Sequence, residues 1–155
     1  MQKTFKPKPQ LFPLNDDSYL EINRIGERAT MSMEKRSIWE WTNEDGRVMF
    51  VKWRYDFTSK ETGEPDKKYY PIERINNEYV ETGPSWKPYP LFKLHELVKT
   101  TKPILVVEGL WTCDSAQRLL PDYFVTTWCG GVSSWDLTNW EPLKDKKDVI
   151  FWPDN

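Results

Sequence analysis

Two acidic residues in the last third of the chain stand where they can bind a cation. Glu108 directly follows the apolar run 104–107, and Asp154 stands two residues after the end of the expected strand 148–152. Because neighbouring parallel strands end at the same edge of a sheet, two such carboxylates can converge on one Mg²⁺, which prefers oxygen ligands. The alternative is structural: Glu108 caps the next helix and Asp154 is a turn residue.

The elements that must position these carboxylates are three strands and two helices. Continuous apolar runs bounded by turn residues are typical of strands buried on both faces of a parallel sheet. The segments between the runs carry the capping residues of helices. The expected order is strand 104–107, helix 112–120, strand 123–128, helix 133–140 and strand 148–152. This βαβαβ order predicts a Rossmann-like parallel sheet within residues 101–155.

A glycine pair, Gly130 and Gly131, separates the second of these strands from the second helix. Backbone N–H groups at the start of a helix bind phosphate well, so the pair is a candidate phosphate-binding turn. A Gly-Gly turn is by itself weak evidence for such a site.

Residues 37–100 are predicted to form an antiparallel β region. The turn Asp45-Gly46 between aromatic and β-branched runs is a strong hairpin signal. In the strand that follows it, one set of alternating side chains is apolar and is expected to face the core: Met49, Val51, Trp53 and Tyr55. Lys52 and Arg54 then stand together on the opposite face.

The predicted fold class is therefore α+β, in three parts. An irregular N-terminal arm (1–36) precedes the antiparallel β region (37–100), and a parallel α/β unit follows (101–155). Within the middle part we expect a polar loop over 57–68, short strands at 69–72 and 78–80, and a short helix near 91–98. The only histidine, His95, falls in this short helix, where an ordinary structural role is expected.

The composition excludes several classes of protein. The 155 residues are 38% hydrophobic and 15% aromatic, which argues against a disordered or collagen-like chain. The formal net charge is -2, so any contact with nucleic acid must be local. No apolar run is long enough to span a membrane. Two cysteines are too few for a disulfide framework or a four-cysteine zinc site, and a cytoplasmic location is expected.

The order of motifs in residues 38–155 resembles the TOPRIM domain of phage, plasmid and bacterial primase-like proteins, together with the region that precedes it. The matching motifs are Ile104-Leu-Val-Val-Glu-Gly109, Thr126-Thr-Trp-Cys-Gly-Gly131 and Val149-Ile-Phe-Trp-Pro-Asp-Asn155. Glu-Gly after a buried strand is weakly specific alone, and the three motifs in this order are more specific.

This resemblance implies a role for each matched residue. Glu108 matches the glutamate that acts as general acid or base in nucleotidyl transfer, and with Asp154, the first Asp of an Asp-x-Asp motif, it is a candidate ligand of Mg²⁺. Basic residues upstream would contact phosphates of single-stranded DNA or of a primer and template. The candidates are Lys52, Arg54, Lys67 and Lys68.

The chain departs from the family pattern in two places. Leu110-Trp111 replaces the Glu-Lys that often follows Glu-Gly, and the sequence stops at Asn155, before the second Asp of Asp-x-Asp. We therefore expect either part of a longer protein or a shortened derivative, and the sequence leaves enzymatic activity open. A sheet that ends at its third strand has an exposed edge, which favours pairing with a protein partner or with a second copy.

Three functions remain open from the sequence. The first is a primase-like TOPRIM protein that binds nucleic acid and Mg²⁺ for nucleotidyl transfer in DNA replication. The second is a non-catalytic derivative from a mobile element that inhibits by binding protein or nucleic acid. The third is an unrelated small α/β nucleotide-binding domain. A short distance between the oxygens of Glu108 and Asp154 would argue against the third.

Overall fold

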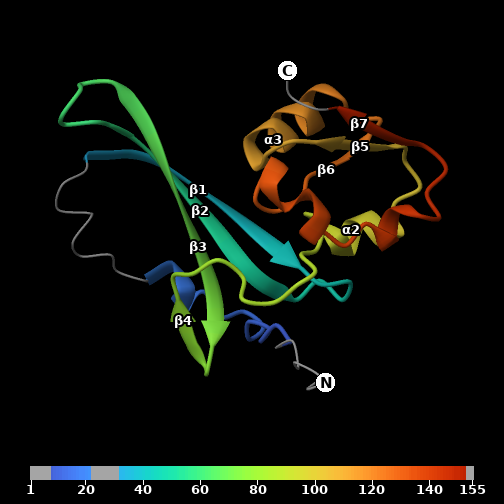
Figure 1. The fold of residues 1–155 in the computed structure, drawn as a ribbon, viewed down its shortest axis with the longest axis horizontal. Coiled ribbons are helices and arrows are strands. Elements are labelled where there is room, and N and C mark those ends of the chain that lie inside the picture. The colour runs from blue at the N-terminus through green and yellow to red at the C-terminus, as the bar shows by residue number, and fades with distance from the viewer. Residues whose placement is uncertain (1–7, 22–31, 153–155) are drawn as a thin grey trace.

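Two separate sheets make up the chain, and the computed structural model describes residues 8–21 and 32–152 of it (Figure 1). The first sheet is antiparallel in the order β1-β2-β3-β4, and the second is parallel in the order β6-β5-β7. The strands are β1 (Ser32–Thr42), β2 (Val48–Thr58), β3 (Pro65–Ile75), β4 (Glu78–Val80), β5 (Ile104–Val107), β6 (Phe124–Thr126) and β7 (Val149–Trp152). The mixed α+β class is confirmed, as is an antiparallel region followed by a parallel sheet.

The helices are short and lie mostly around the parallel sheet (Figure 1). They are η1 (Ser18–Glu21), α2 (Leu94–Lys99), α3 (Leu110–Leu119), η2 (Val132–Leu137) and η3 (Glu141–Leu143), where η marks a 3-10 helix. Helix α3 begins two residues before the predicted Thr112, because Gly109 turns the chain at φ 85° directly after β5. Within the described residues no helix has the length and apolarity to cross a membrane.

The predicted helix over 133–140 is present only as a shorter 3-10 helix, Val132–Leu137, because contacts with the segment before α2 end it early. The amide of Tyr89 donates to the carbonyl of Leu137, and the amide of Asn139 donates to the carbonyl of Tyr89. These bonds form an isolated parallel bridge between Tyr89 and Thr138. The Thr138 hydroxyl also donates to the carbonyl of Ser134, an acceptor that an α-helix would need for its own ladder. Only the 3-10 helix η2 remains.

The predicted polar loop over 57–68 is also too long. Strands β2 and β3 pair as far as Thr58 and Pro65, so the connection is confined to residues 59–64. Backbone pairing satisfies the ladder even where the side chains are exposed and charged, as at Asp66 and Lys67. Strand β1 likewise begins at Ser32, inside the segment expected to be an irregular arm.

The hairpin turn at Asp45-Gly46 is confirmed, and it contacts helix α2. Gly46 has φ 84°, which favours glycine, and a Cβ there would lie 3.2 Å from Nδ1 of His95. Nδ1 of His95 is 2.7 Å from the carbonyl oxygen of Glu44, and Nε2 is 2.9 Å from Nζ of Lys99. With a carbonyl accepting at Nδ1, the ring takes the tautomer in which Nε2 accepts from Lys99. His95 thus connects α2 to the turn, in agreement with its expected structural role.

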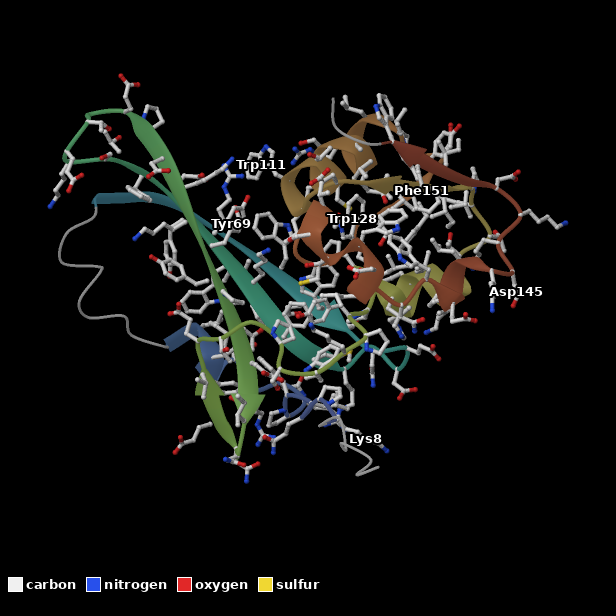
Figure 2. All side chains as sticks on the ribbon, viewed as in Figure 1. Lys8, Tyr69, Trp111, Trp128, Asp145 and Phe151 are labelled. Carbon is white, nitrogen blue, oxygen red and sulfur yellow. The ribbon has the colours of Figure 1, made fainter. Side chains whose placement is uncertain are left out.

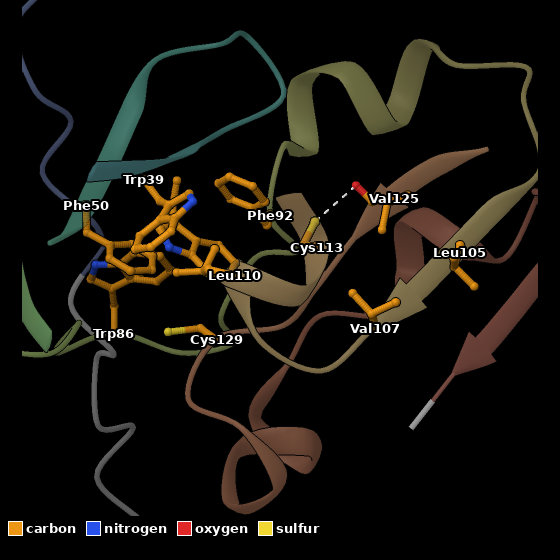
Figure 3. Packing of buried hydrophobic residues seen from close by; sticks show 11 residues of the cluster. Trp39, Phe50, Trp86, Phe92, Leu105, Val107, Leu110, Cys113, Val125 and Cys129 are labelled. Carbon is orange, nitrogen blue, oxygen red and sulfur yellow. Dashed lines mark hydrogen bonds between the residues drawn. The ribbon is translucent and has the colours of Figure 1, made fainter. Parts of the chain in front are cut away.

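Both faces of the antiparallel sheet are buried, each against a different part of the chain. The predicted core face holds Val51, Trp53 and Tyr55, which pack with Phe12 and Tyr19 of the N-terminal segment. The other face carries a second core, in which the sheet packs against the parallel unit (Figure 3). Its main members are Trp39, Trp41, Phe50, Phe92, Leu105, Val107, Leu110 and Val125.

Met49 was expected on the first of these faces, and this prediction is wrong. The register of β1 and β2 shifts between Trp41 and Thr42, so that Trp41 pairs with Phe50 and Thr42 with Val48. Met49 is the extra residue of this bulge and packs against the second core, while Val48 packs against the first. The irregularity reverses the alternation of side chains at this end of β2.

Trp41 lies at the centre of the contact between the two sheets, and its replacement by alanine tests that contact. The side chain has no exposed surface, and its ring stacks on Phe50 at 5.1 Å between centroids. We expect Trp41→Ala to lower the free energy of unfolding by about 3–5 kcal/mol, measured by urea denaturation. Leu14→Ala, at a site that is 74% exposed, should change it by less than about 0.5 kcal/mol. Equal effects of the two variants would contradict the assignment of this core.

Candidate functional site

The carboxyl ends of β5 and β7 lie at one edge of the parallel sheet, and Glu108 stands at that edge. Val107, the last residue of β5, pairs with Trp152, the last residue of β7. The backbone N–H of Gly109 donates to the hydroxyl of buried Thr127 at 3.0 Å, which ties the end of β5 to the end of β6. Glu108 itself is half-buried and forms no hydrogen bond or ion pair with another described residue. Its carboxylate is therefore available to a ligand.

The predicted phosphate-binding turn lies directly beside this carboxylate. A Cβ added to Gly131, at φ 67°, would lie 3.5 Å from Oε1 of Glu108, in ordinary contact, and one added to Gly130 would clash with Oγ of Ser134. The indole N–H of Trp128 and the amide of Ser134 both donate to the carbonyl of Gly131, which fixes the turn. Gly130 thus requires glycine because a side chain would clash with Ser134, and the positive φ of Gly131 favours glycine at that position as well.

The chemistry of this turn differs from that of a phosphate loop before an α-helix. The six-residue 3-10 helix η2 follows the glycines, without the long aligned dipole of a full α-helix. A phosphate near Gly131 would also meet the negative charge of Glu108. Because like charges repel at this range, a phosphate can settle here only with a cation between the two groups. The pair Glu108 and Gly131 thus fits a cation-bridged phosphate better than a bare one.

Mg²⁺ fits the donor that the described residues supply. The ion commonly takes one or two carboxylates and completes its shell with water and substrate phosphate. Glu108 supplies one such carboxylate, and no group of three or more metal-binding side chains is found in the part of the chain that the structure describes. Asp154, the second predicted ligand, lies outside the described residues.

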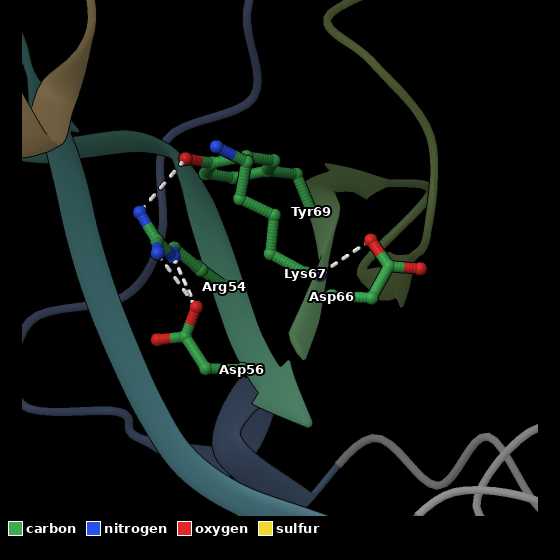
Figure 4. A network of polar contacts seen from close by, with 5 residues as sticks. All are labelled: Arg54, Asp56, Asp66, Lys67 and Tyr69. Atoms are coloured by element: carbon green, nitrogen blue, oxygen red, sulfur yellow. Dashed lines mark hydrogen bonds and ion pairs between the residues drawn. The ribbon is translucent and has the colours of Figure 1, made fainter. Parts of the chain in front are cut away.

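The four predicted basic residues do not share one face. Arg54 pairs with Tyr69, and two residues further on Asp56 pairs with Lys67, so Arg54 and Lys67 lie on the same face of the sheet as Lys52 (Figure 4). Lys68 pairs with Tyr55 and therefore belongs to the opposite face. A ligand that follows one face can meet three of the four.

Arg54 is held in place by neighbours on both sides. Its guanidinium bonds to Asp56 at 2.6 and 2.7 Å and donates to the hydroxyl of Tyr69 (Figure 4). Its Cζ lies 4.4 Å from the centre of the Trp111 ring, in the first turn of α3 (Figure 2). Burial alone would lower the pKa of Arg54, but the hydrogen bond and charge of Asp56, with Tyr69, raise it overall. Arg54 thus stays charged and positions the sheet against α3.

Lys52 lies on the face of β2 that also carries Phe50, whose core cluster includes Cys129 just before the glycine pair. Burial raises the pKa of the Cys129 thiol, and the positive charge of Lys52 opposes that rise. The Lys52 ammonium also lies 5.2 Å from the centre of the Tyr69 ring. Arg54 thus reaches Trp111, three residues after Glu108, and Lys52 lies on the same face of β2 as Arg54. We call Lys52, Arg54, Glu108, Trp111 and Gly131 the junction.

Two members of this neighbourhood, Tyr69 and Trp111, were missed from the sequence. Tyr69 was assigned to a strand without a partner, and its place opposite Arg54 depends on the register of β2 and β3. Trp111 contacts Arg54 only because the two sheets pack together. Trp128, just before the glycine pair, is buried (Figure 2). Trp135 packs against it and is 43% exposed.

Comparisons with models of known protein families, with curated proteins and with solved structures found no match.

The two buried thiols give a prediction that tests the packing around the junction. Burial raises the pKa of Cys113 from 9.0 to about 12, and it raises that of Cys129 as well. We expect neither thiol to react with a disulfide reagent at pH 8 until urea unfolds the protein. Rapid labelling of the native protein would contradict this burial.

The same shift sets the sign of a pH dependence. The folded protein holds the Cys113 proton more tightly than the unfolded chain, so this contribution to stability is complete below pH 9.0 and is lost as the pH rises to about 12. Urea denaturation between pH 8 and pH 11 should show falling stability, and Cys113→Ala should flatten the fall. An equal slope in both proteins would contradict the assignment to Cys113.

Proposed function

We propose that the chain is a primase-like protein of the TOPRIM type, or part of one, that binds single-stranded nucleic acid and Mg²⁺ for nucleotidyl transfer. The observation that carries the proposal is the junction, where Arg54 of β2 stacks on Trp111, three residues after Glu108, with Lys52 on the same face of β2 and Gly131 beside Glu108. Such a role in DNA replication implies a cytoplasmic protein.

The charge distribution supports a nucleic acid that follows the sheet face. The chain has a net charge of -2, so binding must come from a local group of cations and not from the overall field. Lys52 and Lys67 supply such charges on one face, and the ring of Tyr69 lies among them. Cations that follow the phosphates, combined with aromatic rings that stack on bases, are the usual means of binding single strands.

Glu108 supports the metal-dependent part of the proposal. It would hold Mg²⁺ with Asp154, the ligand that the family resemblance adds, and a bound Mg²⁺ would neutralise the charge of a transferring phosphate. Gly131 leaves room beside the carboxylate, because a side chain there would contact Oε1. Lys52 adds a positive charge on the side of the antiparallel sheet. The chain's own residues thus orient the phosphate and stabilise its charge.

A second candidate function is a non-catalytic derivative that acts as a binding inhibitor. The observation that favours it concerns Leu110 and Trp111, which replace the charged pair common in the family. Leu110 is buried in the core between the two sheets, and Trp111 stacks on Arg54. Both residues contribute to packing, so the junction lacks the two charges of the family's Glu-Lys pair, which a catalytic site would use.

Removing two cations from the sheet face should weaken binding of single-stranded DNA. We expect the double variant Lys52→Gln with Lys67→Gln to reduce affinity and to flatten the salt dependence by about 1.4 in slope, from about 0.7 per phosphate contact. Fluorescence anisotropy of a labelled oligonucleotide across a salt titration measures both. The control, Lys60→Gln with Lys147→Gln, changes the net charge equally at exposed positions away from the junction. If both double variants behave alike, the sheet face is not the binding site.

Replacing the carboxylate of Glu108 should separate metal binding from binding of DNA. We expect Glu108→Gln to lose the Mg²⁺-dependent gain in DNA affinity, and to lower any primer synthesis by at least about 100-fold, while metal-free affinity stays unchanged. Glu96→Gln, at an exposed position on α2, removes the same charge as a control. An unchanged response to Mg²⁺ in the Glu108 variant would remove this residue from the site.

A further inference from the structure

The two edges of the parallel sheet differ sharply, and the β6 edge is closed. The amide of Phe124 donates to the carbonyl of Pro103, which immediately precedes β5, so the backbone groups of its neighbours Tyr123 and Val125 point away from β5. The side chain of Gln117 on α3 satisfies two of them, accepting from the amide of Val125 at 3.0 Å and donating to the carbonyl of Tyr123 at 2.9 Å.

Further contacts complete the closure of this edge. The thiol of Cys113 donates to the carbonyl of Val125, and the amide of Phe92 donates to the carbonyl of Thr127. The outward backbone groups along β6 therefore have partners within the chain. A strand of another molecule would have to displace these bonds before it could pair here.

The same examination of backbone hydrogen bonds shows that the β7 edge is open. The amide of Ile104 donates to the carbonyl of Asp148, so Asp148, Ile150 and Trp152 turn their backbone groups toward β5. Val149 and Phe151 turn theirs outward, and no described residue bonds to them. Strand β7 also contains no charge and no proline, the features that usually block pairing at an edge.

Apolar side chains are exposed on both sides of this open edge. Ile150 and Trp152, on the side of α3, are 46% and 61% exposed, and Trp152 lines an apolar hollow of about 300 Å³ with Leu119. On the other side, Phe151 is 46% exposed and packs against Trp135 at 5.4 Å between ring centroids. These exposed apolar side chains favour, as a partner of β7, another strand that has apolar side chains on both of its faces.

We infer that β7 pairs with β7 of a second copy of this chain, in antiparallel orientation about a two-fold axis at Ile150. In this register, Val149 of one copy lies opposite Phe151 of the other, and the outward amides and carbonyls of both residues exchange hydrogen bonds. At the two-fold axis, Ile150 of one copy lies opposite Ile150 of the other copy. The pairing satisfies every outward group of Val149 and Phe151 and joins two three-stranded sheets into one. A second copy is favoured because the uncharged strand matches itself in this register.

The dimer should be weak. From the aromatic and aliphatic side chains at the edge, each copy would bury roughly 500 Å², less than the approximately 800 Å² per partner of a standard interface. The monomer and dimer should therefore exchange within an accessible range of concentration.

The test is sedimentation velocity of residues 1–155 from about 1 to about 500 µM, a range that spans micromolar dissociation constants. We expect wild type to shift from monomer to dimer, and Ile150→Lys to remain a monomer because two like charges would meet at the axis. Leu14→Lys, a control at an exposed apolar residue of the N-terminal segment, should dimerise like wild type. A wild-type protein that stays monomeric, or an Ile150→Lys protein that dimerises, overturns the inference.

Two further measurements test the register itself. Mixing Ile150→Lys with Ile150→Glu should restore a dimer, since opposite charges then meet at the axis, and failure to restore it overturns this register. In wild type, hydrogen exchange at the amides of Val149 and Phe151 should slow as concentration rises. The amides of Ile150 and Trp152, which already bond to β5, should not change. Equal changes at all four amides would contradict pairing along this edge, and this readout needs no variant to fold.

Discussion

The packing of Phe50 and Trp41 against the parallel unit determines where the charged groups of the junction lie. Side chains along a strand alternate between faces, so the face that places Phe50 in the core also carries Lys52 and Arg54. Once Phe50 is fixed, the next two positions on its face point toward the same neighbouring unit. The apolar contact thus orients both cations toward the parallel unit, where Arg54 meets Trp111 of α3.

The strands of the parallel sheet could be predicted well because their signal is local. The run 104–107 is buried throughout, as its unbroken apolar sequence indicates, and β6 and β7 lie within the predicted runs. The hairpin at Gly46 follows from a turn that needs a positive φ. The place of Glu108 at the end of β5 follows from the same local pattern. These features depend on a few adjacent residues and on backbone geometry.

The remaining features depend on contacts between distant segments. The helix predicted over 133–140 ends at Leu137, as a 3-10 helix, because of bonds to Tyr89, a residue far from this segment in the sequence. The position of Met49 depends on a one-residue bulge, and the contact of Arg54 with Trp111 on the packing of two sheets. Half of the predicted metal site, Glu108, is placed by the structure, and the other half, Asp154, falls outside the described residues.

The side chain of Gln117 has a consequence for assembly that reaches beyond its two hydrogen bonds. A molecule with one unpaired edge strand can pair that strand with a single neighbour, and assembly then stops at a dimer. A molecule with unpaired strands at both edges of its sheet could pair with a neighbour on each side, and the assembly could then extend without limit. Gln117, together with the Cys113 thiol, occupies the outward backbone groups of β6, so that strand pairing is limited to one side of the sheet.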